Sequence, residues 1–113
     1  MLFRSTNLMP EELERQADAV TGGGGRVRSA AFSVSAGPRG EQAVVVAELE
    51  GPPSETLPAL AREIRTRIGQ TLELPLADVV FVRRGRIPRT TSGKLRRAEL
   101  RRLYLDGSLE RLE

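Results

Sequence analysis

The sequence contains no cysteine and no histidine, and each absence excludes a class of chemistry. Without cysteine there is no disulfide, no thiolate zinc site and no cysteine nucleophile, and without histidine there is no histidine-based triad. Aromatic residues make up only 4% of the chain, which provides no platform on which nucleic-acid bases could stack. Any chemistry must therefore use carboxylates, hydroxyls, backbone amides, arginine or lysine.

Long apolar segments are also missing. No run of about 18 apolar residues is present, so the sequence predicts no transmembrane helix. The first residues, Met1 to Ser5, lack the apolar core of a signal peptide, and we expect a cytoplasmic protein. With 113 residues, 39% hydrophobic and 29% charged, residues 1–113 suit one globular domain with a modest core.

Lysine is nearly absent, and its single occurrence is informative. Of the 18 basic residues 17 are arginines, and the exception is Lys94. A guanidinium suits two-pronged binding of anions, whereas an ammonium is a compact charge on a flexible stem. The basic residues also cluster, because the range 83–102 carries nine of them and one acid, a charge of +8 in a chain of net charge +3. Such asymmetry indicates a surface that faces a partner.

Three segments carry apolar residues at helical spacing. The first begins at Pro10, which suits the first turn of a helix, and ends at the glycines of 22–25. The second runs from 57 to 68 and the third from about 95 to 105.

Three further segments have the pattern of strands. Alternating residues from Val27 to Ser35 predict a half-buried strand, and continuous apolar runs over 43–47 and 79–82 predict buried ones. The first two should pair as a hairpin. With a short segment at 2–8 that could be extended, the prediction is an α+β fold: a small mixed sheet of about three main strands plus a short N-terminal strand or hairpin, with flanking helices.

A hydroxyl-rich loop, Thr90-Thr91-Ser92-Gly93-Lys94, lies between the last predicted strand and the last predicted helix. Gly93 permits a tight turn, the hydroxyls supply donors, and Lys94 brings a positive charge. The loop is not a Walker A motif, because no earlier glycine has the required spacing and no Ser or Thr follows the lysine. From the residues alone, an anion-binding loop and a plain exposed loop both stay open.

The loop and its flanks resemble a known signature. The range 85–97, Gly-Arg-Ile-Pro-Arg-Thr-Thr-Ser-Gly-Lys-Leu-Arg-Arg, is similar to the C-terminal Pro-[Lys/Arg]-Thr-x-Ser-Gly-Lys loop and basic helix of adenylate-forming enzymes. A second stretch, Asn7 to Glu14, resembles their segment after the hinge between large and small domains. The details look most like fatty acyl-AMP ligases, except that Ser5 stands where that family usually has glycine.

This resemblance implies that residues 1–113 are the C-terminal lid domain of an ATP-dependent fatty acyl-AMP ligase. A large N-terminal domain, absent from this sequence, would bind most of the ATP and Mg²⁺ and the fatty acid. Lys94 would be the catalytic lysine of acyl-adenylate formation, within a phosphate loop made by Thr90, Thr91, Ser92 and Gly93. The lid by itself should be inactive.

The resemblance also implies an acceptor, the phosphopantetheine arm of an acyl carrier protein. Such proteins are acidic, so a basic helix surface could steer them to the lid through Arg96, Arg97, Arg101 and Arg102. Three alternatives stay open: an acyl- or aryl-CoA synthetase that uses coenzyme A, a regulatory domain without catalysis, and a basic nucleic-acid-binding module. The scarcity of aromatics argues against the last.

Overall fold

The computed structural model describes residues 10–21, 28–35, 40–50, 57–72 and 76–112. The elements, in chain order, are α1 (Pro10–Thr21), β1 (Ser29–Ser35), β2 (Glu41–Leu49), α2 (Leu57–Leu72), β3 (Leu76–Arg83) and α3 (Arg97–Asp106). The predicted α+β fold is therefore confirmed. The segment at 2–8 that could be extended, the glycine run and residues 7–9 of the stretch Asn7 to Glu14 lie outside the described residues.

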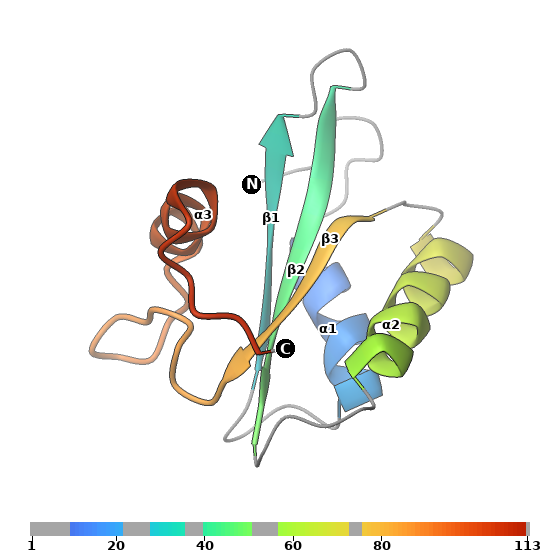
Figure 1. Cartoon of the computed structure of the whole chain (residues 1–113), viewed down its shortest axis with the longest axis horizontal. Coiled ribbons are helices and arrows are strands. Elements are labelled where there is room, and N and C mark those ends of the chain that lie inside the picture. The colour runs from blue at the N-terminus through green and yellow to red at the C-terminus, as the bar shows by residue number, and fades with distance from the viewer. Residues whose placement is uncertain (1–9, 22–27, 36–39, 51–56, 73–75, 113) are drawn as a thin grey trace.

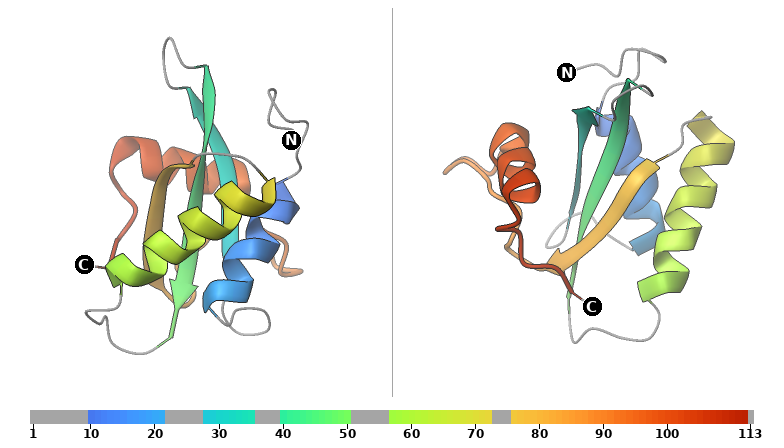
Figure 2. Two further views of the ribbon diagram at one scale, coloured as in Figure 1. Left: turned by 90° about the vertical axis from the view of Figure 1, so that its right-hand side faces the viewer. Right: turned by 45° about the horizontal axis from the view of Figure 1, so that its top comes forward.

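The sheet has the order β1-β2-β3. β1 pairs antiparallel with β2 as the predicted hairpin, and β3 pairs parallel with β2, so the sheet is mixed. A parallel neighbour requires a crossover connection, which contains α2. Figure 1 shows α1 and α2 on one face of the sheet and α3 on the other, and the two turned views of Figure 2 show the same three layers. The burial predicted for the 43–47 strand is confirmed, and this strand, β2, is the central one.

Each face of the sheet packs its own apolar core. The face under α1 and α2 buries a cluster that includes Leu13, Ala31, Val45, Ile64 and Ile68. On the opposite face α3 and the chain before it cover a second cluster that includes Phe32, Val46, Val80, Ile87 and Leu100. Ile87 is only 2% exposed and Leu100 is fully buried. The chain on both sides of the hydroxyl-rich loop 90–94 is therefore fixed to the sheet by hydrophobic burial.

β1 differs from the prediction of a half-buried strand. Its residues from Ser29 to Val34 are all buried, because helices cover both faces of the sheet. The buried serine Ser29 does not lack partners: its hydroxyl donates to the carbonyl of Glu14 at 3.3 Å and also contacts the Asp18 carboxylate. Alternation of serine with apolar residues therefore did not mark a solvent-facing side here.

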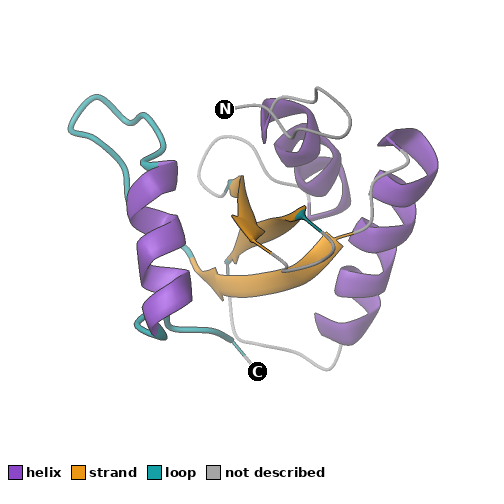
Figure 3. Cartoon of the chain, turned by 90° about the horizontal axis from the view of Figure 1, so that it is seen from above, coloured by secondary structure: helices purple, strands orange, loops and turns teal. Residues whose placement is uncertain are grey.

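α3 begins two residues later than predicted. Leu95 forms an isolated antiparallel bridge with Arg89 instead of entering the helix. The amide of Arg96 then donates to the Pro88 carbonyl at 2.9 Å, and the helix starts at Arg97. We call residues Arg89–Leu95 the motif hairpin. Figure 3 shows this teal loop extending outward beyond the N-terminal end of α3, away from the sheet.

Candidate functional site

The tip of the motif hairpin is closed by a small set of hydrogen bonds around Thr90. Its amide donates to the Lys94 carbonyl at 2.8 Å, and its own carbonyl accepts from the Gly93 amide at 2.9 Å. The Thr90 hydroxyl accepts from the Lys94 amide at 3.1 Å and lies 3.0 Å from the Ser92 hydroxyl. Gly93 has φ +89°, a conformation that side-chain-bearing residues rarely adopt. The predicted tight turn at Gly93 is therefore confirmed.

Lys94 is exposed at this tip, together with Thr90, Thr91, Ser92 and Gly93. In the described ranges every carboxylate that forms an ion pair does so with an arginine, and the Lys94 ammonium takes no part. The hydrogen bonds to Lys94 involve its backbone only. Among the described residues, the Lys94 side chain therefore has no hydrogen-bond or ion-pair partner, and it can reach outward to an anion.

The base of the hairpin is built around a buried carboxylate, Glu48, which is 0% exposed near the end of β2. Arg89 binds it through both terminal nitrogens, with Nη2 at 2.9 Å from Oε1 and Nη1 at 3.3 Å from Oε2. Backbone amides complete the shell: Gly85 donates at 2.9 Å, Ile87 at 3.2 Å and Arg28 at 3.2 Å. A buried charge requires such partners, and here one side chain collects five donors.

A second buried carboxylate, Glu14 of α1, holds the chain that follows the hairpin. Arg97, the first residue of α3, donates to it from Nε at 2.8 Å and from Nη2 at 2.7 Å. The Glu14 Oε2 atom also accepts the amide of Ala31 at 2.8 Å, on the free edge of β1. The hydrogen bond to Glu14 raises the pKa of Arg97 above its usual value, burial opposes this, and the nearby charges of Glu14 and Glu11 add to the rise.

The four arginines expected to form one docking surface point to different places. Arg97 is engaged with Glu14, and Arg101 donates from Nε to the Ser33 carbonyl at 2.9 Å. Arg96 is exposed just before α3. Arg102 is 59% exposed but pairs with Glu99 at 2.6 Å and Asp106 at 3.1 Å. α3 therefore turns Arg97 and Arg101 toward α1 and β1 and leaves Arg102 largely exposed, while Arg96 is exposed just before the helix.

Sequence reasoning missed the two glutamates that organise this site. Glu48 carried a signal, because it ends the apolar run of β2 and is the only charged residue within the buried stretch Ala43–Glu48. A charge in such a run is rarely buried without a partner. Glu14 ends the stretch that resembles the family's segment after the hinge, but its position on an amphipathic helix beside other acids did not indicate burial.

The described ranges hold no group of three or more His, Cys, Asp or Glu residues that could bind a metal ion. No helix in the same ranges has both the length and the apolar composition needed to cross a membrane.

No protein-family model matches the chain, but comparison with known proteins finds relatives that agree with one another. The long-chain-fatty-acid–AMP ligase FadD23 of Mycobacterium tuberculosis is 34% identical over 116 residues, covering 100% of this chain and 19% of that protein. A putative fatty-acid–CoA ligase of the same species, FadD25, is 34% identical over 119 residues, covering 100% of this chain and 20% of that protein. A solved structure from work on fatty acyl-adenylate ligases of E. coli and L. pneumophila has TM-score 0.73 and 25% identity, covering 95% of this chain and 18% of that one.

The chain spans about a fifth of the length of the curated relatives that it matches. Fold and sequence agree over nearly all of its residues, and the chain belongs to the C-terminal domains of adenylate-forming enzymes, with fatty acyl-AMP ligases among its homologues. These relatives are ligases, so they give no support to a nucleic-acid-binding module.

Proposed function

We propose that this chain is the lid of a fatty acyl-AMP ligase and that Lys94 is its catalytic residue. The observation that carries the proposal is the position of the chain's single lysine, exposed at the tip of a hairpin whose flanks are fixed by ion pairs to buried glutamates of β2 and α1. A residue that must enter another domain's active site has to project from its own domain. It must also be held on a rigid support.

The chemistry that suits such a lysine is attack of a fatty carboxylate on the α-phosphorus of ATP. An oxygen–phosphorus bond forms, the bond to pyrophosphate breaks, and negative charge accumulates on the reacting oxygens. An ammonium placed beside them stabilises that charge and orients the attacking carboxylate. Loss of one preorganised contact of this kind lowers the rate by roughly 10²–10³-fold. Binding of ATP, Mg²⁺ and the fatty acid is assigned mainly to a large partner domain.

A fusion enzyme tests this proposal. This chain replaces the corresponding C-terminal part of FadD23, and acyl-AMP formation from ATP and a long-chain fatty acid is measured. We expect the fusion to be active, the isolated chain to be inactive, and Lys94→Ala to lower the rate by roughly 10²–10³-fold. The matched control is Arg62→Ala, an exposed cation of α2 on the opposite face of the sheet.

Three outcomes contradict the proposal. The first is a Lys94→Ala fusion that forms acyl-AMP at the unsubstituted rate. The second is an unsubstituted fusion that forms none although circular dichroism shows it to be folded. The third is an equal loss of rate in Lys94→Ala and Arg62→Ala, which would show that the lysine has no specific role.

For the second half-reaction we propose transfer of the acyl group to a carrier protein. The candidate contact is Arg96, which is exposed and precedes the paired arginines of α3. An exposed positive charge of this kind attracts acidic partners. The test compares carrier protein with coenzyme A as acceptor for Arg96→Glu, with Arg62→Glu as the control. We expect Arg96→Glu and added salt to slow transfer to the carrier. Preference for coenzyme A would favour the CoA-synthetase alternative.

A further inference from the structure

Glu48, the buried carboxylate at the base of the motif hairpin, binds every second residue of the range 85–89. Glu48 accepts from the amides of Gly85 and Ile87 and then from the side chain of Arg89. These three contacts fix the path of the chain from the end of β3 to the first residue of the hairpin. Glu48 itself cannot move easily, because it lies fully buried in β2, the central strand of the sheet.

The returning leg of the hairpin depends on this first leg. Arg89 bridges to Leu95, the Thr90 amide binds the Lys94 carbonyl at 2.8 Å, and the Arg96 amide binds the Pro88 carbonyl at 2.9 Å. Lys94 thus lies opposite residues whose position Glu48 and Arg89 determine. Movement at Arg89 is passed to Lys94 through the backbone of one short hairpin.

We propose that Glu48 and Arg89 are positioning residues that set where Lys94 lies relative to the reacting atoms. This inference rests on the catalytic role proposed for Lys94. Neither residue is assigned a contact with substrate. A misplacement of about 1 Å in a reacting geometry can cost about 10²-fold in rate, so a rigid base is required for the exposed tip to work.

The shape of the arginine matters as well as its charge. The two terminal nitrogens of Arg89 bind the two different oxygens of Glu48, which fixes the guanidinium plane as well as its distance. A lysine at position 89 would keep the charge and offer a single point of attachment. Arg89→Lys should therefore retain stability better than it retains placement of the hairpin.

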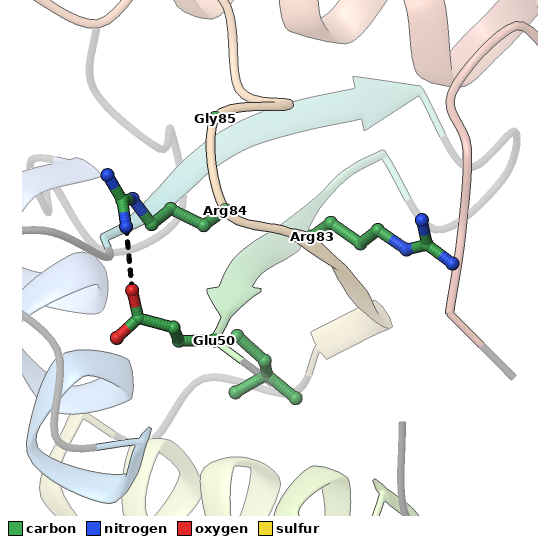
Figure 4. Close-up of a pocket in the computed structure, with 5 residues that line it drawn as sticks. Glu50, Arg83, Arg84 and Gly85 are labelled. Atoms are coloured by element: carbon green, nitrogen blue, oxygen red, sulfur yellow. Dashed lines mark hydrogen bonds and ion pairs between the residues drawn. The ribbon is translucent and has the colours of Figure 1, made fainter. Parts of the chain in front are cut away.

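A nearby pair supplies a matched control. Arg84 and Glu50 form an ion pair at 2.7 Å between the same two chain segments, and Figure 4 shows it at the rim of an open hollow. Both side chains are about half exposed, at 46% and 50%, whereas Glu48 is fully buried. Arg84→Ala removes an arginine–glutamate pair five residues before Arg89, outside the hairpin.

The experiment measures acyl-AMP formation by the fusion enzyme with Arg89→Ala, Arg89→Lys, Arg84→Ala, Lys94→Ala and the double variant Arg89→Ala/Lys94→Ala. We expect Arg89→Ala to lower kcat by roughly 10- to 100-fold, with the KM for ATP and for fatty acid within about twofold. Arg89→Lys should lie between it and the unsubstituted enzyme, and Arg84→Ala should be within about twofold of unsubstituted. The double variant should be no slower than Lys94→Ala, because the position of the hairpin no longer affects the rate through Lys94 once that side chain has been removed.

A second measurement uses the 113-residue chain alone. Amide hydrogen exchange in Arg89→Lys, which keeps a positive charge against Glu48, should accelerate at Thr90, Gly93 and Lys94 and stay unchanged at the β2 amides of Val44 to Val46. Exchange that accelerates throughout the sheet would show general destabilisation and overturn a positioning role.

The outcomes separate this inference from the proposed function. If Lys94→Ala abolishes adenylation while Arg89→Ala keeps the unsubstituted kcat, the positioning role is wrong and the catalytic lysine stands. If Lys94→Ala has no effect, the proposed function fails first. A double variant much slower than Lys94→Ala would show that Arg89 acts independently of the lysine and would overturn the inference.

Discussion

The tip of the motif hairpin and its base are neighbours in sequence but lie in opposite environments. At the tip Thr90 to Lys94 are exposed, and their hydrogen bonds are local, within five residues. At the base the contacts join distant parts of the chain: Arg89 meets Glu48 and Arg97 meets Glu14. The tip is therefore tolerant of substitution for stability, and the base is not.

This division allows a reactive residue to be presented without being strained. An ammonium that must contact an anion in another domain cannot be engaged by carboxylates of its own domain. The buried carboxylates near the hairpin bind arginines instead. The chain's one lysine, Lys94, has no side-chain partner among the described residues. The comparison can be tested by stability measurements at the base and at the tip.

The largest effect is expected for Glu48→Gln. The amide group of glutamine would face backbone and guanidinium donors in a buried site, leaving Arg89 without its charged partner. Breaking a buried pair in this way costs about 3–5 kcal/mol of unfolding free energy. Urea denaturation followed by circular dichroism measures it. The exposed counterpart Glu50→Gln should change stability by no more than about 1 kcal/mol, and equal losses in both would show that burial is not the deciding factor.

A smaller loss is expected for Arg97→Ala. Its guanidinium joins α3 to α1 through two short hydrogen bonds to Glu14, and its side chain is 25% exposed. Bonds to charged groups of this kind contribute about 1.5–3 kcal/mol. Denaturation of Arg102→Ala gives the control, because that side chain is 59% exposed and its loss should destabilise the fold clearly less than the loss of Arg97. If Arg102→Ala were as costly, the Glu14 pair would have no special weight.

The smallest effect is expected for Lys94→Ala. The side chain is exposed and its described hydrogen bonds come from the backbone, which alanine retains. The unfolding free energy should stay within about 0.5 kcal/mol of the unsubstituted chain. A large loss in the same urea titration would mean that Lys94 stabilises the fold, and its proposed catalytic role would lose its structural basis.

The stability comparison also bears on the docking arginines. Arg97→Glu and Arg101→Glu would place a carboxylate against Glu14 and against the Ser33 carbonyl. Lost transfer in such variants would report on the fold as well as on the carrier protein. Arg96 provides the informative substitution, because it is exposed and precedes α3.

Much of the fold followed from local pattern. The helix from Pro10, the paired strands and the turn at Gly93 were all predicted, because apolar periodicity and glycine chemistry act over a few residues. The burial of Ser29 and Ser33 was not predicted, since it depends on which helices cover which face. The start of α3 was placed two residues early, because the bridge from Leu95 to Arg89 is a tertiary choice that helix propensity does not reveal.

By itself the sequence determined the family signature, the α+β class and the unique status of Lys94, because each depends on residue type and spacing. The tertiary structure alone decided which charges are engaged. Glu48 and Glu14 lie far from Arg89 and Arg97 in sequence, and only the packing of α1, β2 and α3 brings them together. Pairing at such separations depends on burial and three-dimensional proximity, which spacing along the chain does not encode.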